Sequence, residues 1–137
     1  MQEAIMEKQV LSTSQQNMEA YFKTHDVKYV AEDAVFIDLS TGKETKGREA
    51  IGQMLHYIYH VAFDATADVR NKIITEDKAM LEGFFKGRHI GEVDGLKATN
   101  KEVNVPLCVS YDLENGLIKE ARVYMLADVM MRQLNAE

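Results

Sequence analysis

The sequence predicts an α+β domain in which helices cover one face of a mostly antiparallel sheet. The prediction rests on a long hairpin, two alternating segments before it, and one amphipathic helix. These features occupy residues 101–126, 64–74 with 79–90, and a helix that begins at 45–49. A chain of 137 residues is long enough to bury the apolar face of such a sheet, so we expect one domain over residues 1–137.

Composition narrows the classes of function. The formal net charge is -6 and the pI is near 5.2, and no basic cluster is visible, so we expect no nucleic-acid partner. Charges interrupt the N-terminal segment, which therefore predicts neither a signal peptide nor a membrane span. Cys108 is the single cysteine, and no Cys/His spacing matches a zinc site. We expect no metal site, no membrane partner and a cytoplasmic location.

Residues 3–24 carry apolar side chains at helical spacing. Within them, Thr13-Ser14-Gln15-Gln16 has the form of a capping box, in which a hydroxyl side chain caps the first turn. The main helix is therefore predicted to begin near Ser14, leaving residues 1–12 as a loose N-terminal arm or a separate turn.

The next segment predicts a short helix, a strand and a longer helix. Asp26 is a cap residue for a helix over 26–31, and Ala34 to Leu39 reads as a strand. The longer helix has one apolar stripe at the i, i+4, i+7, i+11 spacing, formed by Ile51, Leu55, Ile58 and Ala62. This stripe is predicted to lie over the sheet.

Two strands follow, and both contain exceptions to their alternation. Residues 64–74 place Asn71 on the apolar face, unless a bulge turns it outward. Residues 79–90 carry Gly83 and Gly87 on one face, and glycine in a strand indicates a bend or a close approach by another segment.

The hairpin is the best-defined element. Asn115-Gly116 supplies the two positive φ angles that a type I′ turn requires. The first strand carries a continuous apolar face of Val103, Val105, Leu107, Val109, Tyr111 and Leu113. Residues 128–133 predict a final helical turn that closes one end of the sheet.

Several short motifs together resemble the nuclear transport factor 2-like superfamily, and the nearest resemblance is to its SnoaL-like polyketide cyclase and ketosteroid isomerase branches. The motifs span nearly the whole chain and are Ala31-Glu32-Asp33-Ala34-Val35-Phe36, Gly47-Arg48-Glu49-Ala50-Ile51, Gly87-Arg88-His89-Ile90-Gly91-Glu92, Ala98-Thr99-Asn100-Lys101-Glu102-Val103, Asn115-Gly116-Leu117-Ile118, Arg122-Val123-Tyr124 and Gln133-Leu134. The resemblance implies a cone-shaped, strongly curved sheet with helices on its concave face around a deep pocket.

The resemblance also implies two catalytic residues. Asp38 stands where the ketosteroid isomerases carry their general base, which takes a proton from carbon beside a carbonyl. Tyr21 resembles the tyrosine that donates to the substrate oxyanion in the same branch. The alternatives are that Asp38 accepts backbone N–H groups of the following turn, and that Tyr21 is a core residue.

Other positions depart from the family pattern. Val109 stands where the isomerases place a second, protonated carboxylic acid. Ala121 and Val123 stand where the cyclases carry an acid/base Asp and a His, and Leu126 replaces an acidic residue of many relatives. These departures leave open whether the chain is catalytic.

His89 is the third predicted catalytic residue. It lies on the glycine-bearing face, and histidine titrates near neutral pH, which suits it to polarise a carbonyl or to act as an acid. The alternative is an ordinary backbone hydrogen bond at the mouth of the cone. His56 and His60 lie off the apolar stripe of their helix and are expected to be solvated.

The two faces of the sheet predict different partners. The concave face predicts a pocket for a hydrophobic small molecule, or a plain core if the helices fill the space. Its predicted lining residues are Phe36, Leu55, Ile58, Asn71, Phe85, Leu107, Val109, Ala121, Val123 and Met125. The convex face mixes polar and apolar residues and predicts a homodimer interface formed by Phe84, Arg88, Cys108, Ser110, Arg122 and Tyr124.

Three functions follow from these expectations. The first is an enzyme without metal or organic cofactor, an isomerase or cyclase/lyase that moves a proton beside the carbonyl of a hydrophobic substrate. The second is a non-catalytic binder of a hydrophobic metabolite. The third is a dimerisation scaffold without a pocket.

Overall fold

The computed structural model describes residues 2–136, with side chains from Thr13 onward, so Met1 and Glu137 of the predicted domain lie outside the described residues. Helices and strands alternate in the first half of the chain, and strands dominate the second. The elements are α1 (Gln2–Thr24), the 3-10 turn η1 (Val27–Tyr29), β1 (Val30–Asp38), β2 (Lys43–Lys46), α2 (Arg48–His56), the π-helical turn η2 (Tyr57–Ala62), β3 (Phe63–Ile74), β4 (Lys78–His89), β5 (Glu102–Glu114), β6 (Leu117–Met125) and α3 (Ala127–Asn135).

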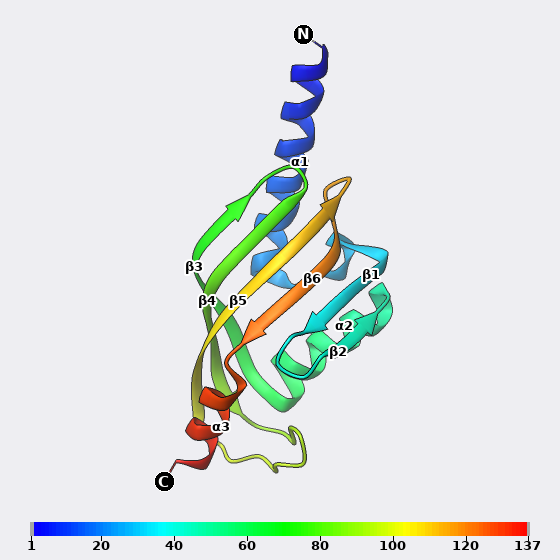
Figure 1. Cartoon of the computed structure of the whole chain (residues 1–137). Coiled ribbons are helices and arrows are strands. Elements are labelled where there is room, and N and C mark those ends of the chain that lie inside the picture. Colours follow the sequence, from blue (N-terminus) through cyan, green and yellow to red (C-terminus); the bar gives the residue numbers. More distant parts are fainter. Residues whose placement is uncertain (1, 137) are drawn as a thin grey trace.

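The strands form one mixed sheet in the order β2-β1-β6-β5-β4-β3, in which only the β1–β6 pair is parallel. The four long strands β3 to β6 form the predicted meander, and the sheet is strongly curved (Figure 1). α1 and α2 lie on its concave side, and α3 lies beside the start of β5 (Figure 1). The predicted α+β class, with helices covering a curved sheet, is confirmed.

The hairpin forms as predicted. Asn115 and Gly116 have φ angles of 54° and 77°, the two positive values of a type I′ turn. All six side chains of the predicted apolar face of β5 are buried, and they form the core together with residues such as Phe85, Ile118 and Ala121. Burial of this face is the main favourable term that holds the helices onto the sheet.

Glycine allows β3 to approach β4 closely. A Cβ atom on Gly83 would lie 2.0 Å from the carbonyl oxygen of Asp68, and one on Gly87 would lie 2.3 Å from that of Asp64. The pairing of β3 with β4 also shifts between Val69 and Asn71, as at a β-bulge. The two close approaches and the shift bend β3 toward α1.

The predicted start of the first helix is wrong. α1 is continuous from Gln2, and its first part extends past the ends of the strands (Figure 1). Ser14 is fully buried inside the helix, and its hydroxyl donates to the carbonyl oxygen of Glu76 at 2.7 Å. The hydroxyl that resembled a cap therefore fastens α1 to the turn between β3 and β4.

The segment after α1 also differs from the prediction. Asp26 does act as a cap, because its carboxylate accepts the backbone N–H of Lys28 at 2.9 Å. The helix it begins is only a 3-10 turn, since Val30 already pairs with Ile118 of β6. The sequence pattern missed β2, whose Lys43 pairs with Asp38 of β1.

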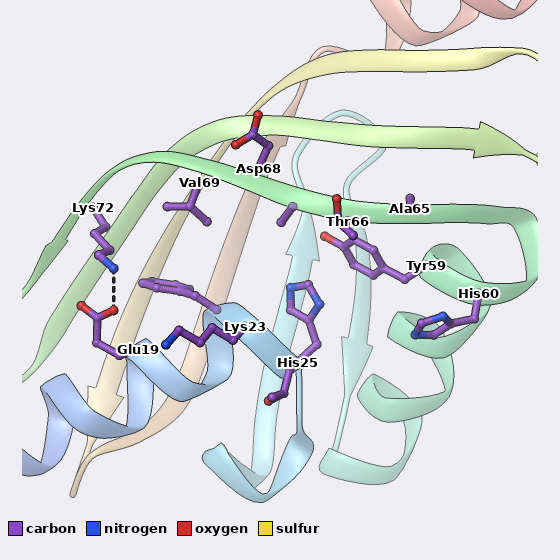
Figure 2. A pocket seen from close by; sticks show the side chains of 13 residues that line it. Glu19, Lys23, His25, Tyr59, His60, Ala65, Thr66, Asp68, Val69 and Lys72 are labelled. Carbon is purple, nitrogen blue, oxygen red and sulfur yellow. Dashed lines mark hydrogen bonds and ion pairs between the residues drawn. The ribbon is translucent and has the colours of Figure 1, made fainter.

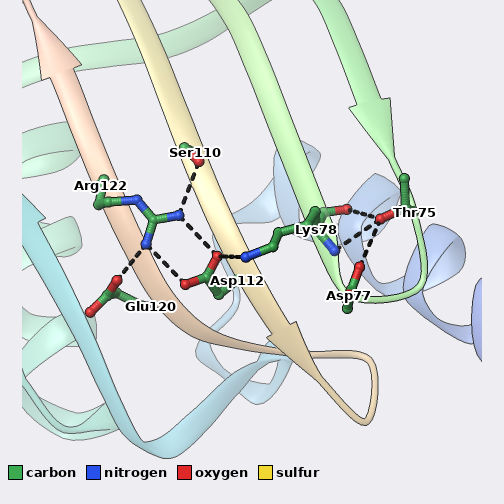
Figure 3. Close-up of polar contacts among 7 residues, drawn as sticks. All are labelled: Thr75, Asp77, Lys78, Ser110, Asp112, Glu120 and Arg122. Atoms are coloured by element: carbon green, nitrogen blue, oxygen red, sulfur yellow. Dashed lines mark hydrogen bonds and ion pairs between the residues drawn. The ribbon is translucent and has the colours of Figure 1, made fainter.

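The convex face carries a network of charged side chains across β4, β5 and β6 (Figure 3). Arg122 donates to both carboxylate oxygens of Asp112 at 2.9 and 3.0 Å, and Lys78 donates to the same carboxylate at 2.6 Å. Exposed apolar side chains lie on the same face, among them Met80 and Tyr124. The homodimer through this face stays a prediction, which the molar mass in solution would test.

Candidate functional site

A pocket with a volume of about 420 Å³ opens between the last turns of α1, the turn η2 and strand β3 (Figure 2). Its wall combines an apolar strip with charged groups and a histidine–tyrosine pair. The lining residues are Glu19, Phe22, Lys23, Thr24, His25, Tyr59, His60, Ala65, Thr66, Ala67, Asp68, Val69 and Lys72. The volume lies in the range usual for small-molecule sites.

His25 is held in the pocket wall by an unusual backbone conformation. It follows the last residue of α1 with a φ of 53°, and its N–H donates to the carbonyl oxygen of Tyr21 at 2.8 Å. Glycine normally occupies such a left-handed position at a helix end, because a Cβ atom there costs about 1 kcal/mol. Strained positions of this kind cluster at functional sites.

Aromatic rings fix the imidazole from two sides. The ring of His25 stacks on that of Tyr59 with centroids 4.4 Å apart and an interplanar angle of 29°. The ring of Tyr21 meets the imidazole edge-on, with centroids 5.3 Å apart. The ring of Tyr111 in turn meets that of Tyr21 edge-on, with centroids 6.1 Å apart. We refer to Tyr21, His25, Tyr59 and Tyr111 as the aromatic cluster.

The turn η2 supplies Tyr59. Its six residues form a single π-helical turn after α2, which is wider than an α-helical turn. Figure 2 shows Tyr59 and His60 projecting from this turn toward the same pocket. The apolar stripe that continues through Ile58 faces the core instead. Such π-helical turns are frequent at functional sites.

Burial keeps the cluster uncharged. It lowers the pKa of His25 from 6.5 to about 4, with a smaller contribution from the nearby charge of His60. Burial raises the pKa of Tyr59 to about 12, and it also raises those of Tyr21 and Tyr111 above their ordinary value. Imidazole and phenol are therefore neutral at pH 7, and neutral groups of both kinds can donate hydrogen bonds.

The hydrogen-bonding groups of the cluster are available. Within the residues that the structure describes, the imidazole of His25 and the hydroxyls of its three tyrosines make no side-chain hydrogen bond. Among the described side chains, only Nε2 of His89 is both buried and unpaired, so the hydrogen-bonding atoms of the cluster remain accessible to solvent. The cluster therefore offers unused donors next to the pocket.

The charged groups of the pocket wall are mostly paired. Lys72 donates to Glu19 at 2.5 Å, which joins β3 to α1 at one side of the pocket (Figure 2). Asp68 accepts from Arg70 at 2.9 Å, and this hydrogen bond lowers the pKa of Asp68. A carboxylate held in its charged form by a cation is a weak proton acceptor.

The predicted catalytic residue Asp38 lies at the end of β1, half-buried. Its carboxylate accepts the backbone N–H of Ser40 at 2.9 Å and the hydroxyl of Ser40 at 2.6 Å. This is the turn contact that the sequence left open as the alternative to catalysis.

The predicted catalytic residue His89 is fully buried at the end of β4. Its Nδ1 accepts the backbone N–H of Thr99 at 3.1 Å, so the proton of the neutral ring is on Nε2. Nε2 is buried and has no partner in the described part of the chain. The ring packs against Phe63, with centroids 5.1 Å apart.

The predicted catalytic residues do not form one group. Among the described residues, no hydrogen bond, ion pair or aromatic contact joins any two of Asp38, Tyr21 and His89, and none of them lines the pocket. Tyr21 lies directly behind His25, whereas Asp38 and His89 belong to other surroundings. Their catalytic roles stay predictions.

The predicted pocket-lining set lies beside the pocket rather than in its wall. Nine of the ten residues belong to the core or pack against it, namely Phe36, Leu55, Ile58, Phe85, Leu107, Val109, Ala121, Val123 and Met125. Asn71 follows the alternative that the sequence left open, because the register shift turns it outward, where it donates to Glu82 at 2.9 Å. His56 and His60 are exposed as expected, but His60 also lines the pocket.

The sequence analysis missed His25 and Tyr59 as site residues. The one signal for His25 was its position directly after the helical pattern of residues 3–24, and this position indicates only that the helix ends there. Tyr59 is next to Ile58 of the apolar stripe but is not part of the stripe. Its position depends on the π-helical turn, and the helical spacing of the sequence does not predict such a turn.

Two kinds of feature are absent from the described residues. No helix among residues 2–136 is both long and apolar enough to cross a membrane. No three His, Cys, Asp or Glu side chains in this range gather closely enough to hold a metal ion.

Solved structures share the fold at low sequence identity. A candidate SnoaL-like polyketide cyclase from Jannaschia sp. CCS1 has a TM-score of 0.82 at 15% identity, over 93% of this chain and 95% of that chain. IdmH from Streptomyces antibioticus, a candidate polyketide cyclase, has a TM-score of 0.71 at 21% identity, over 91% and 98%. A protein of ketosteroid isomerase-like fold from Catenulispora acidiphila DSM 44928 has a TM-score of 0.65 at 16% identity, over 83% and 86%.

Sequence comparison identifies the family. No curated protein matches the chain. The family model of the SnoaL-like polyketide cyclases matches residues 13–134, which is most of the chain and extends from the second half of α1 into α3. The protein therefore belongs to the SnoaL-like polyketide cyclase family, one of the two branches that its motifs resemble.

Proposed function

We propose that the chain is a cyclase/isomerase-type enzyme that binds a small apolar carbonyl compound in the pocket between α1, η2 and β3. The observation that carries the proposal is the stacked pair of His25 and Tyr59 in the pocket wall. The left-handed backbone at His25 is unfavourable for histidine, and it holds the imidazole in that wall.

The proposed role of the pair is to donate hydrogen bonds to the substrate oxygen. Removal of a proton beside a carbonyl creates negative charge on that oxygen, and preorganised donors stabilise it. His25 and Tyr59 suit this role because their pKa values of about 4 and about 12 leave both neutral near pH 7. Tyr21, directly behind His25, supports the imidazole in this arrangement.

The family resemblance implies Asp38 as the base. Asp38 lies at the end of β1 and outside the pocket wall, so the substrate in this proposal has to extend from the pocket to that strand end. The two carboxylates of the pocket wall are poorer candidates, because Glu19 and Asp68 are each paired with a cation. Asp38 would have to exchange its hydrogen bonds to Ser40 for the substrate proton. A positioned general base accelerates such a step by about 10²- to 10⁴-fold.

The proposal is tested with a panel of β,γ-unsaturated cyclic ketones, whose isomerisation to conjugated enones is followed by ultraviolet absorbance. His25→Asn should lower kcat at least about tenfold, because asparagine tolerates the left-handed backbone but cannot stack on Tyr59. Asp38→Asn should abolish turnover if Asp38 is the base. His56→Asn, a change of an exposed histidine outside the pocket wall, is the matched control and should leave kcat unchanged.

The outcomes separate the roles. Turnover that survives Asp38→Asn but not His25→Asn would remove Asp38 as the base and keep the pocket. Turnover that survives both substitutions would overturn the proposed site.

A non-catalytic binder is the second candidate function. The paired state of Glu19 and Asp68 favours it, because neither carboxylate is available as a base, and Val109 cannot donate a hydrogen bond as the isomerases' second acid does. In that case 2-naphthol, a planar apolar phenol, should bind with a change in its fluorescence while no ketone of the panel is turned over. His25→Asn should still weaken this binding.

A further inference from the structure

Among the side chains that the structure describes, one cation of the pocket wall has no ion-pair partner. Four lining residues are formally charged, namely Glu19, Lys23, Asp68 and Lys72. Glu19 pairs with Lys72, and Asp68 pairs with Arg70 outside the wall. Lys23 has no ion-pair partner among the described residues. The charges within each of these two ion pairs cancel. The positive charge of Lys23 is therefore left without a compensating carboxylate in the wall.

The position of Lys23 relates this charge to the aromatic cluster. Lys23 lies one helical turn after Glu19 and two residues before His25, on the same side of the pocket (Figure 2). Apolar side chains line the space between α1 and β3, among them Phe22, Ala65 and Val69. One ligand can therefore contact an apolar strip, the neutral donors of the cluster and a free ammonium group.

We propose that the pocket selects apolar compounds that carry an anionic group such as a carboxylate, which Lys23 binds while His25 and Tyr59 contact the compound's hydroxyl or carbonyl oxygen. The inference rests on the proposed function of the pocket. The overall charge does not explain such a preference, because a chain with a net charge of -6 repels anions. The preference is therefore a local property of the wall.

The test compares two probes that differ in charge but hardly in shape, 6-hydroxy-2-naphthoic acid and its methyl ester. Their dissociation constants are measured by fluorescence titration at pH 7 and low salt. The acid should bind about fivefold more tightly than the ester, as expected for one partly exposed ion pair. The preference should shrink in 0.5 M salt, because salt screens such a pair.

Substitutions test whether Lys23 causes the preference for the acid over the ester. Lys23→Met should reduce the affinity for the acid to that for the ester, because methionine keeps the apolar stem and the helix propensity but carries no charge. Lys28→Met is the matched control, since Lys28 is an exposed lysine of η1 outside the pocket wall, and it should keep the full preference. The melting temperature of each variant shows whether α1 is intact, because Lys23 also lies in the last turn, where a cation stabilises a helix.

The outcomes distinguish this inference from the proposed function. Equal affinity for acid and ester in the unmodified protein, or a preference that survives Lys23→Met, would overturn the inference and leave the pocket intact. Failure of both probes to bind would overturn the pocket itself and with it the inference.

Discussion

The concave side of the sheet contains a fully buried histidine, His89, and a half-buried one, His25, and their surroundings differ. His89 lies in a regular strand, with Nδ1 bonded to the backbone of Thr99 and its ring against Phe63. His25 lies in a left-handed turn, without a side-chain hydrogen bond in the described structure, and its ring lines a pocket. The comparison teaches that burial alone does not indicate function; the backbone conformation and the neighbouring space do.

The largest expected effect is on stability, at His89. His89→Ala should lower the free energy of unfolding by about 3–4 kcal/mol, because it leaves a cavity beside Phe63 and removes the acceptor for the N–H of Thr99. Urea denaturation measures this loss. His56→Ala, at an exposed position, is the control and should change the free energy by less than about 0.5 kcal/mol.

The same variant also tests the predicted catalytic role of His89. If His89 is structural, 2-naphthol should bind the folded variant with unchanged affinity. A large loss of affinity or of turnover in a protein that is still folded would show that His89 has a functional role. It would contradict the difference between a structural His89 and a functional His25.

The second effect is a dependence of stability on pH that His25 causes. Its pKa is about 4 in the folded protein and 6.5 ordinarily, so between these values the unfolded chain binds a proton that the folded chain does not. Stability should therefore fall as the pH is lowered from 6.5 to 4, by up to about 3 kcal/mol. Urea midpoints at several pH values measure the slope, and His25→Asn should flatten it. A slope that persists in the variant would show that the imidazole is not buried as described.

The smallest expected effect comes from Asp112 on the convex face, and it distinguishes the titration of Asp112 from that of His25. Hydrogen bonds from Arg122 and Lys78 hold the pKa of Asp112 well below its ordinary value of 3.8. A carboxylate with a lowered pKa stabilises the fold above its ordinary pKa and loses this effect as the pH falls below it. Asp112→Asn should therefore cost about 1 kcal/mol at pH 7, because the network is partly exposed, and should leave the slope between pH 4 and 6.5 unchanged.

The comparison of the two histidines also shows how far the sequence predicts this molecule. Alternation and the Asn115-Gly116 turn predicted the meander, because each depends on the local backbone or on side-chain periodicity. The glycines of β4 indicated a bend or a close approach, and the strong curvature of the sheet was implied by the family resemblance. β2 was missed because four exposed residues carry no apolar signal. The start of α1 was misplaced because the hydroxyl of Ser14 bonds a turn 62 residues away rather than its own helix.

The candidate site was predicted less well than the fold. Tyr21 was predicted from the family resemblance, and it does lie in the aromatic cluster, although its catalytic role is untested. His25, Tyr59 and Lys23 were missed because their positions depend on a left-handed residue and on one π-helical turn, and neither has a distinct local pattern.

The sequence by itself determined the α+β class, the order of the long strands, the core face of β5 and the family. These properties follow from periodicity and from turn chemistry, which act over a few residues. Only the tertiary structure decided which interior residues are packed core and which line a pocket. That distinction depends on how β3 bends toward α1 and where η2 places its side chains, and both result from contacts between segments far apart in the chain.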